Sequence, residues 1–252
     1  MRAGAPVLGT MLVEARAPEF VTALAAAGFE LLFLDLEHGT YSLSDMKALS
    51  REARRVGALL VARTHVHDAA HLTRLLDAGA RGVMIAHAED PVELAPLVSA
   101  TRFPPEGTRG YGLHGVVTDY RGEGPKELMA RENEEVVVLL QLESEAATTR
   151  ENLERLADLS GVDGWVVGPR DLSISLGVPG EHDHPREVAV VERVLEVGRR
   201  HGIATGVHEG DLGLLTRWAS AGASILAFSS EVGLVLDAGR RVVGLLRRHA
   251  KA

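Results

Sequence analysis

Short apolar segments alternate with longer amphipathic segments along the whole chain. The short segments have the length and β-rich composition of strands, and they comprise Val7–Leu12, Leu31–Glu37, Leu59–Thr64, Gly82–His87, Val136–Glu143, Gly164–Pro169, Ile203–His208 and Ser224–Ser230. The amphipathic segments between them predict helices over Pro18–Ala27, Leu43–Val56, Asp68–Ala78, Pro91–Thr101, Ala146–Leu159, Pro185–His201, Asp211–Ala221 and Val232–Arg248. Glycines such as Gly57 and Gly202 stand just before the next strand, where helix C-caps fall.

These alternations in 252 residues predict an α/β protein that folds as a single (β/α)8 TIM barrel over residues 1–252. A doubly wound open sheet is the structural alternative, because periodicity alone does not show whether a sheet closes. One long insertion, Phe103–Glu135, is rich in Gly, Pro and Arg. Loops of this length are often functional, although some are merely mobile surface.

Composition excludes several function classes. The chain has no cysteine, which rules out disulfides, thiolate metal sites and cysteine nucleophiles. Its formal net charge of −8 argues against a nucleic-acid partner. Its longest apolar runs are far below the roughly 18 residues of a membrane span, and Met1–Pro6 has no signal-peptide core. We therefore expect a soluble, cytoplasmic protein without nucleic-acid or membrane partners.

Polar residues gather at the predicted carboxyl ends of the strands, where TIM barrels carry their catalytic groups. Period-two alternation places Asp35 with Glu37 on one face of a strand, and Gln141 with Glu143 on one face of another. The leucines beside them then face the helices. Acidic groups on the inner face of a barrel are costly to desolvate unless they are paired or bound to metal, which favours a functional role.

Two of the strand-end carboxylates, Glu143 and Asp171, could serve one hard divalent cation. Magnesium or manganese typically takes one or two protein carboxylates and fills its other positions with water and substrate oxygens. The alternative is a structural pair of acids bonded to backbone amides or to Arg170.

Lysine is nearly absent, and this restricts the chemistry. Only Lys47, Lys126 and Lys251 occur, and none lies on a predicted strand. We therefore expect no Schiff-base lysine and no pyridoxal phosphate (PLP), so that carbonyl chemistry would use a metal as its electrophile. The string Gly110–Gly115 matches G-x-G-x-x-G, but it neither follows a strand nor opens a helix, so we expect no NAD.

Landmark segments in a fixed order carry a resemblance to a known family. They include Asp35-Leu36-Glu37-His38, Val61-Ala62-Arg63, Leu75-Leu76-Asp77-Ala78-Gly79, Gly107-Thr108-Arg109-Gly110, Gln141-Leu142-Glu143 and Gly168-Pro169-Arg170-Asp171-Leu172-Ser173. In these segments the chain resembles the HpcH/HpaI aldolases, the class II pyruvate aldolases of the phosphoenolpyruvate/pyruvate barrel superfamily, similar to 4-hydroxy-2-oxoheptanedioate aldolase.

The resemblance implies roles for individual residues. Glu143 and Asp171 match metal ligands for Mg²⁺, Mn²⁺ or Co²⁺. Arg63 matches the arginine that binds the pyruvate carbonyl oxygen and stabilises the enolate. The remaining matches are His38 and Asp77 as a catalytic base dyad, Gln141 and Asp35 as substrate-supporting residues, and Gly168 and Pro169 in the loop that receives the pyruvate carboxylate. A structural Asp77 salt bridge and a barrel-lining His38 are the alternatives.

The function implied is metal-dependent, reversible aldol cleavage of a 4-hydroxy-2-oxo acid to pyruvate and an aldehyde, through a metal-bound enolate. An oxaloacetate-type decarboxylase or a citryl- or malyl-thioester lyase would use the same enolate, and a non-catalytic keto-acid-binding barrel is a third possibility. His87 and Arg170 depart from the family pattern and could favour an anionic or polyhydroxylated aldehyde. Resemblance also implies a homo-oligomer, a hexamer, although the apolar stripe of Val232–Arg248 would serve equally as the last helix of a monomer.

Overall fold

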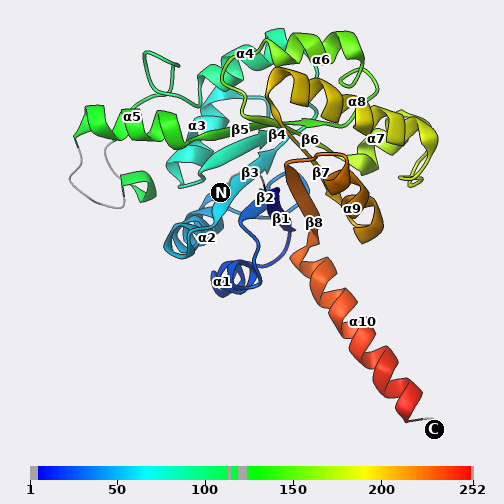
Figure 1. Cartoon of the computed structure of the whole chain (residues 1–252). Helices are drawn as coiled ribbons and strands as arrows, with labels where there is room; N and C mark the ends of the chain where they lie inside the picture. Colours follow the sequence, from blue (N-terminus) through cyan, green and yellow to red (C-terminus); the bar gives the residue numbers. More distant parts are fainter. Residues whose placement is uncertain (1–4, 113–114, 119–123, 251–252) are drawn as a thin grey trace.

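Eight parallel strands close into a barrel in the computed structural model, which describes residues 5–112, 115–118 and 124–250 (Figure 1). The strands pair in sequence order, and β8 pairs with β1 to complete the ring. They are β1 Val7–Leu12, β2 Leu31–Asp35, β3 Leu59–Thr64, β4 Gly82–Ile85, β5 Val137–Leu142, β6 Gly164–Val167, β7 Ala204–Glu209 and β8 Ile225–Ser230. The predicted TIM barrel is confirmed, and the open-sheet alternative is wrong.

Helices connect successive strands on the outside of the barrel (Figure 1). They are α1 Glu19–Ala26, α2 Leu43–Val56, α3 Ala69–Asp77, α4 Pro91–Ser99, α5 Pro125–Glu135, α6 Arg150–Ala157, α7 Pro169–Ser175, α8 Pro185–His201, α9 Leu212–Ser220 and α10 Glu231–His249, with a 3-10 turn η1 at Val116–Thr118. Ser42 begins α2 with a capping box that includes Asp45. Gly57 and Gly202 end α2 and α8 with φ angles of 75° and 71°, as their positions in the sequence predict.

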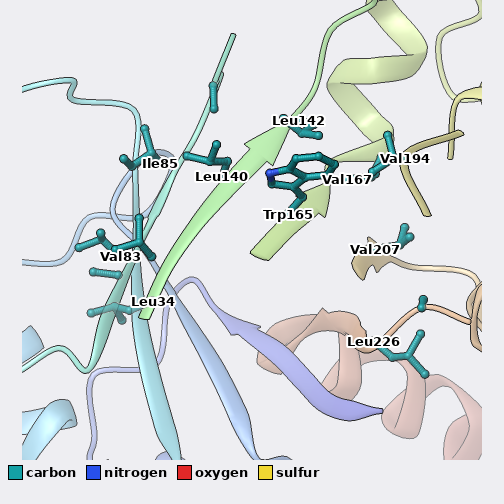
Figure 2. Close-up of a cluster of buried hydrophobic side chains, with 14 of the residues drawn as sticks. Leu34, Val83, Ile85, Leu140, Leu142, Trp165, Val167, Val194, Val207 and Leu226 are labelled. Carbon is teal, nitrogen blue, oxygen red and sulfur yellow. The ribbon is translucent and has the colours of Figure 1, made fainter. Parts of the chain in front are cut away.

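Strand residues alternate between two apolar layers. The inner layer fills the barrel with Met11, Leu31, Phe33, Val61, Met84, Leu139, Val166, Ile225 and Ala227. The outer layer lies between strands and helices and includes the side chains labelled in Figure 2, among them Leu34, Leu140, Leu142 and Trp165. Asp35 and Gln141 therefore continue the inward rows of Phe33 and Leu139, which confirms the predicted faces.

Several predicted boundaries are wrong for local reasons. The strand predicted to reach Glu37 ends at Asp35, because the amides of Glu37 and His38 donate to the Asp35 carboxylate. The helix predicted from Ala146 begins at Arg150, where the Thr149 hydroxyl caps it. The strand predicted to include Pro169 ends at Val167, and Pro169 opens the short helix α7, which sequence analysis missed.

The described part of the Phe103–Glu135 insertion lies at the amino-terminal end of the barrel. Its helix α5 leads directly into the start of β5, and Arg102, just before the insertion, donates to the carbonyl of Gly161 in the turn before β6. None of its described residues lines the cavity at the carboxyl ends of the strands. In the string Gly110–Gly115, Leu113 and His114 lie outside the described residues, and Gly110–Gly112 belong to no helix or strand.

The last helix, α10, extends away from the barrel (Figure 1). Its stripe is exposed at Leu236, Val243 and Leu246, by 48%, 46% and 65%, so it does not pack on its own barrel as the last helix of a monomer would. Leu8, on the outer face of β1, is also 45% exposed. Within the described ranges, no helix combines the length and the apolar character that crossing a membrane demands.

Gly202 supplies a test of the helix ends. Replacing Gly202 with Ala puts a side chain on a residue with φ of 71°, and we expect it to lower the free energy of unfolding by about 1 kcal/mol. Gly239→Ala is the matched control, because Gly239 lies inside α10 with nothing near its added methyl group. There alanine favours the helix. Urea denaturation measures both, and equal effects would contradict the left-handed cap.

Candidate active site

A cavity of about 540 Å³ opens at the carboxyl ends of the strands. Strand β2 and its following loop contribute Asp35 and His38, and β3 contributes Arg63. Additional lining comes from Met11, Val13, Gln141, Glu143, Gly168, Pro169, Arg170, Asp171, Ile174, His208, Glu209, Gly210, Ser229, Ser230 and Gly233. Every predicted site residue except Asp77 therefore reaches one cavity.

Arg63 is the centre of the cavity floor. Its Nε donates to Gln141 Oε1 at 2.7 Å, and its side chain is 5% exposed. Register pairs Asp35 with Arg63 across β2 and β3, and one Arg63 amino group lies 3.3 Å from the Asp35 carboxylate. The other amino group lies 2.5 Å from Glu37 Oε2 and 3.4 Å from Glu143 Oε1. One buried guanidinium thus joins the ends of three strands.

Asp35 also shapes the loop that carries His38. Its Oδ1 accepts the amides of Glu37 at 3.0 Å and His38 at 3.2 Å. A Cβ at Gly39 would lie 2.2 Å from the Asp35 carbonyl oxygen, so the tight turn requires glycine there. The His38 side chain is left 68% exposed at the edge of the cavity, where it is accessible to a substrate hydroxyl.

Glu143 is buried and surrounded by hydrogen-bond donors. Gln141 Nε2 donates to its Oε1 at 2.6 Å, and the amide of His87 donates to its Oε2 at 3.1 Å. Burial raises the pKa of Glu143, while the positive charge of Arg63 opposes that rise. The hydrogen bonds from Gln141 and His87 hold the carboxylate in one orientation.

Glu37 and His87 belong to the same cluster, although neither is among the catalytic, substrate-binding or metal-binding residues that the resemblance implies. His87 Nε2 donates to Glu37 Oε1 at 2.7 Å, and its Nδ1 lies 3.3 Å from Glu143 Oε2. The backbone of His87 has φ of 51°, a conformation that is uncommon outside glycine and concentrates at functional sites. The alternation of Asp35 with Glu37 along the sequence could have identified Glu37 as a member of the cluster. The contacts of His87 depend on its unusual backbone conformation, which the sequence does not reveal.

Asp171 lies on the first turn of α7 and lines the same cavity as Glu143. Gly168, which precedes α7, makes this approach possible. A Cβ at Gly168 would lie 2.5 Å from Glu143 Oε1 and 2.8 Å from Gln141 Nε2. Only glycine lets the start of α7 pass this close to the buried carboxylate.

The donor chemistry fits a hard divalent cation. Within the described residues, no group of three or more His, Cys, Asp or Glu side chains is placed to hold a metal ion. Glu143 and Asp171 instead offer two carboxylates to one cavity, with Gly168 leaving room beside Glu143. An ionised carboxylate has about four lone-pair positions, so the hydrogen bonds on Glu143 leave capacity for a ligand bond. Of the two contacts that the structural alternative predicts, Glu143 makes the hydrogen bond with a backbone amide but not the ion pair with Arg170.

Asp77 and His38 do not meet within the chain. Asp77 is the last residue of α3, at the amino-terminal end of the barrel, whereas His38 is at the carboxyl-terminal mouth. The Asp77 carboxylate accepts from Arg109 at 2.9 Å, as the alternative of a structural salt bridge predicts. The expected dyad is therefore absent from the described part of a single chain.

His208 forms part of the cavity wall between β7 and β8. Its Nε2 donates to the carbonyl oxygen of Ser229 at 2.8 Å. Burial lowers the pKa of His208 from its ordinary value; the hydrogen bond to Ser229 opposes this change, and the positive charges of Arg63 and Arg170 add to it. The imidazole is therefore neutral, with Nδ1 as an acceptor. Of the two lysines within the described ranges, neither lines this cavity; Lys251 lies outside those ranges.

Comparisons with known proteins agree on one family. The sequence profile described as HpcH/HpaI aldolase/citrate lyase matches residues 10–238. The chain is 30% identical to a hydroxypyruvate/pyruvate aldolase from Sagittula stellata, over 98% of this chain and 94% of that protein. It is 31% identical to a 2-dehydro-3,6-dideoxy-6-sulfogluconate aldolase from Pseudomonas putida, over 99% and 96%. The crystal structure of an HpcH/HpaI aldolase from Desulfitobacterium hafniense DCB-2 is similar at a TM-score of 0.91 and 30% identity, covering 97% of this chain and 94% of that one.

The neutral state of His208 predicts a pH dependence of stability. Because the pKa of His208 is lowered below 6.5 in the folded protein, the unfolded chain binds this proton more readily. The free energy of unfolding therefore falls as the pH drops below 6.5. His208→Gln keeps an N–H donor and does not ionise, so its loss of stability between pH 7.5 and pH 5.5 will be smaller. Urea denaturation at both pH values measures this, and identical losses would contradict a neutral, partly buried His208.

Proposed function

Because the chain belongs to the HpcH/HpaI aldolase/citrate lyase family, we propose that it catalyses reversible aldol cleavage of a 4-hydroxy-2-oxo acid to pyruvate and an aldehyde. The observation that carries this proposal is the buried Arg63 on the floor of the cavity, beside Gln141 and Glu143. A fixed cation at that position stabilises negative charge that develops on a substrate oxygen. Relatives named as aldolases support a lyase of this type.

Glu143 and Asp171 are the residues that would hold a divalent metal, with Mg²⁺, Mn²⁺ and Co²⁺ as the candidates. A bound ion of this kind supplies Lewis-acid stabilisation of negative charge on oxygen. Gln141 orients Glu143 through their 2.6 Å hydrogen bond, and His87 and Arg63 fix the same carboxylate from its other sides.

Cleavage needs a base at the 4-hydroxyl and a cation at the 2-oxo group. His38 takes the hydroxyl proton as the bond between C3 and C4 breaks, which releases the aldehyde. The electron pair of that bond forms the enolate of pyruvate, whose oxygen Arg63 stabilises. Transfer of this proton from His38 to the enolate carbon, C3, then gives pyruvate and regenerates the base. The exposed position of His38 at the cavity edge, 68% accessible, supports this role.

Proton exchange in pyruvate tests the enolate chemistry without an aldehyde. We expect the protein with Mg²⁺, Mn²⁺ or Co²⁺ to exchange the methyl protons of pyruvate with deuterium from solvent, as followed by proton NMR. Glu143→Gln removes a proposed metal ligand and should slow exchange by about 100-fold or more. Glu151→Gln, an exposed substitution on α6, is the control. Exchange that survives removal of the metal with a chelator would overturn the proposal.

A decarboxylase and a thioester lyase would use the same enolate, and their products distinguish them. The family description includes citrate lyase, which supports the thioester lyase as the second candidate. Release of carbon dioxide from oxaloacetate would indicate a decarboxylase. Dependence on coenzyme A would indicate a thioester lyase. The preferred metal and the aldehyde are settled by the same assays, run with pyruvate and a series of aldehydes.

We also infer an oligomer, a hexamer by family resemblance. The exposed apolar side chains of α10 and the exposed Leu8 on β1 support it, because contact with a second copy would bury both. Since His38 and Asp77 lie at opposite ends of one barrel, a dyad between them requires Asp77 from another copy.

Mixed assemblies test this arrangement. His38→Ala and Asp77→Asn should each be impaired by about 100-fold, whereas co-expression of the two should restore part of the activity, because some sites then combine an intact His38 with an intact Asp77. His38→Ala co-expressed with Glu143→Gln is the matched control, since both residues line the cavity of one chain and no mixed site is complete. Absence of recovery in the first mixture would contradict a dyad shared between subunits.

A further inference from the structure

Arg170 is a cation on the cavity wall that differs from Arg63 in its surroundings. It lies on the first turn of α7, lines the cavity and is exposed. Arg63 contacts three carboxylates, whereas the guanidinium of Arg170 makes no ion pair with any carboxylate in the described part of the chain. An uncompensated guanidinium inside a concave site is a ready partner for an oxyanion.

Within the described residues, neither of the two cavity-lining acids outside the Arg63 cluster, Glu209 and Asp171, makes an ion pair with Arg170. Glu209 Oε1 accepts the amides of Gly210 at 2.6 Å and Asp211 at 3.1 Å, so this carboxylate is satisfied within its own loop. Asp171 follows Arg170 directly but forms no ion pair with it. His208, which also lines the cavity, is neutral and donates to the carbonyl oxygen of Ser229. The positive charge of Arg170 is therefore available to a ligand.

The course of α7 places Arg170 toward the mouth rather than the floor. Gly168 contacts Glu143 at the buried floor, while Ile174, one turn beyond Arg170, is 64% exposed and still lines the cavity. A substrate whose 2-oxo acid half contacts Arg63 and Gln141 on the floor, and whose aldehyde half runs along α7 toward the mouth, meets two side chains of this helix. Ile174 then offers apolar surface to the carbon chain, and Arg170 lies beside its far end.

His87, the other basic departure from the family pattern, is not available for this task. Its Nε2 is bound to Glu37 and its Nδ1 lies against Glu143. The contacts thus separate two residues that the sequence alone treats alike: His87 is held by Glu37 and Glu143, whereas Arg170 lines the cavity without an ion pair.

Resting on the proposed aldolase function, we propose that Arg170 is a specificity-determining residue that binds an anionic group at the far end of the aldehyde half. The preferred substrates are accordingly 4-hydroxy-2-oxo acids with a second acidic group, such as a carboxylate, sulfonate or phosphate. The guanidinium fork suits the two oxygens of such a group.

A pair of aldehydes that share one carbon chain and differ in the charge at its far end tests the role of Arg170. The probes are 4-oxobutanoate and its methyl ester, each added to pyruvate in the presence of the metal, and the readout is the ratio of their kcat/KM values. In the unmodified protein this ratio should favour the carboxylate by about 10-fold or more. Arg170→Gln should lower the ratio by about 10- to 100-fold, and Arg170→Lys should lower it less, because lysine keeps the charge but not the fork. Arg51→Gln, the same substitution on the exposed face of α2, should keep the original ratio.

Two outcomes would overturn the assignment. An unchanged ratio in Arg170→Gln, accompanied by a higher KM for pyruvate in proton exchange, would mean that Arg170 binds pyruvate itself. If the unmodified protein does not exchange the methyl protons of pyruvate, the proposed aldolase function fails. The role of Arg170 is then decided by direct binding of 4-oxobutanoate, followed by saturation-transfer NMR. Binding at least about 10-fold weaker in Arg170→Gln would then support the anion site, and equal binding would refute it.

Discussion

The site depends on one buried cation that is outnumbered by the acids around it. Arg63 faces Asp35, Glu37 and Glu143, so three carboxylates surround one guanidinium and leave an excess of negative charge when all are ionised. Removing one partner from such a cluster is costly, because it leaves a buried charge uncompensated. The same excess makes the floor attractive to a divalent cation. The ion-pair cluster therefore ties three strands together and also creates the electrostatic demand on which the proposed chemistry rests.

Much of the barrel could be predicted from the sequence, because strand and helix periods are local properties. Alternation placed Asp35 and Gln141 on the inner face, and the structure has them in line with Phe33 and Leu139. The strand ends were less predictable, since β2 stops where the Asp35 side chain captures two amides. Competition between a side chain and the backbone ladder decides such boundaries, and apolar periodicity does not reveal it.

The sequence predicted residues that line the cavity, but it did not predict which of these residues contact one another. Resemblance identified Arg63, Glu143 and Asp171, all of which line one cavity. It also joined His38 to Asp77, which the fold of one chain separates. Likewise, the apolar stripe of α10 has the same sequence pattern whether the helix packs on its own barrel or on another copy. Both questions concern contacts over long distances or between chains, and local sequence patterns carry no information on either.

His87 and Arg170 show why charged residues must be judged by their partners. Both are basic, and both lie at the carboxyl ends of strands or just beyond. His87 bonds Glu37 and lies against Glu143, so its ring is held within the acidic cluster around Arg63. Arg170 has no such partner on α7 or across the cavity, so its charge stays available at the mouth. A floor that is fixed by mutual ion pairs can keep one chemistry, while a single unpaired residue at the mouth determines which aldehyde that chemistry serves.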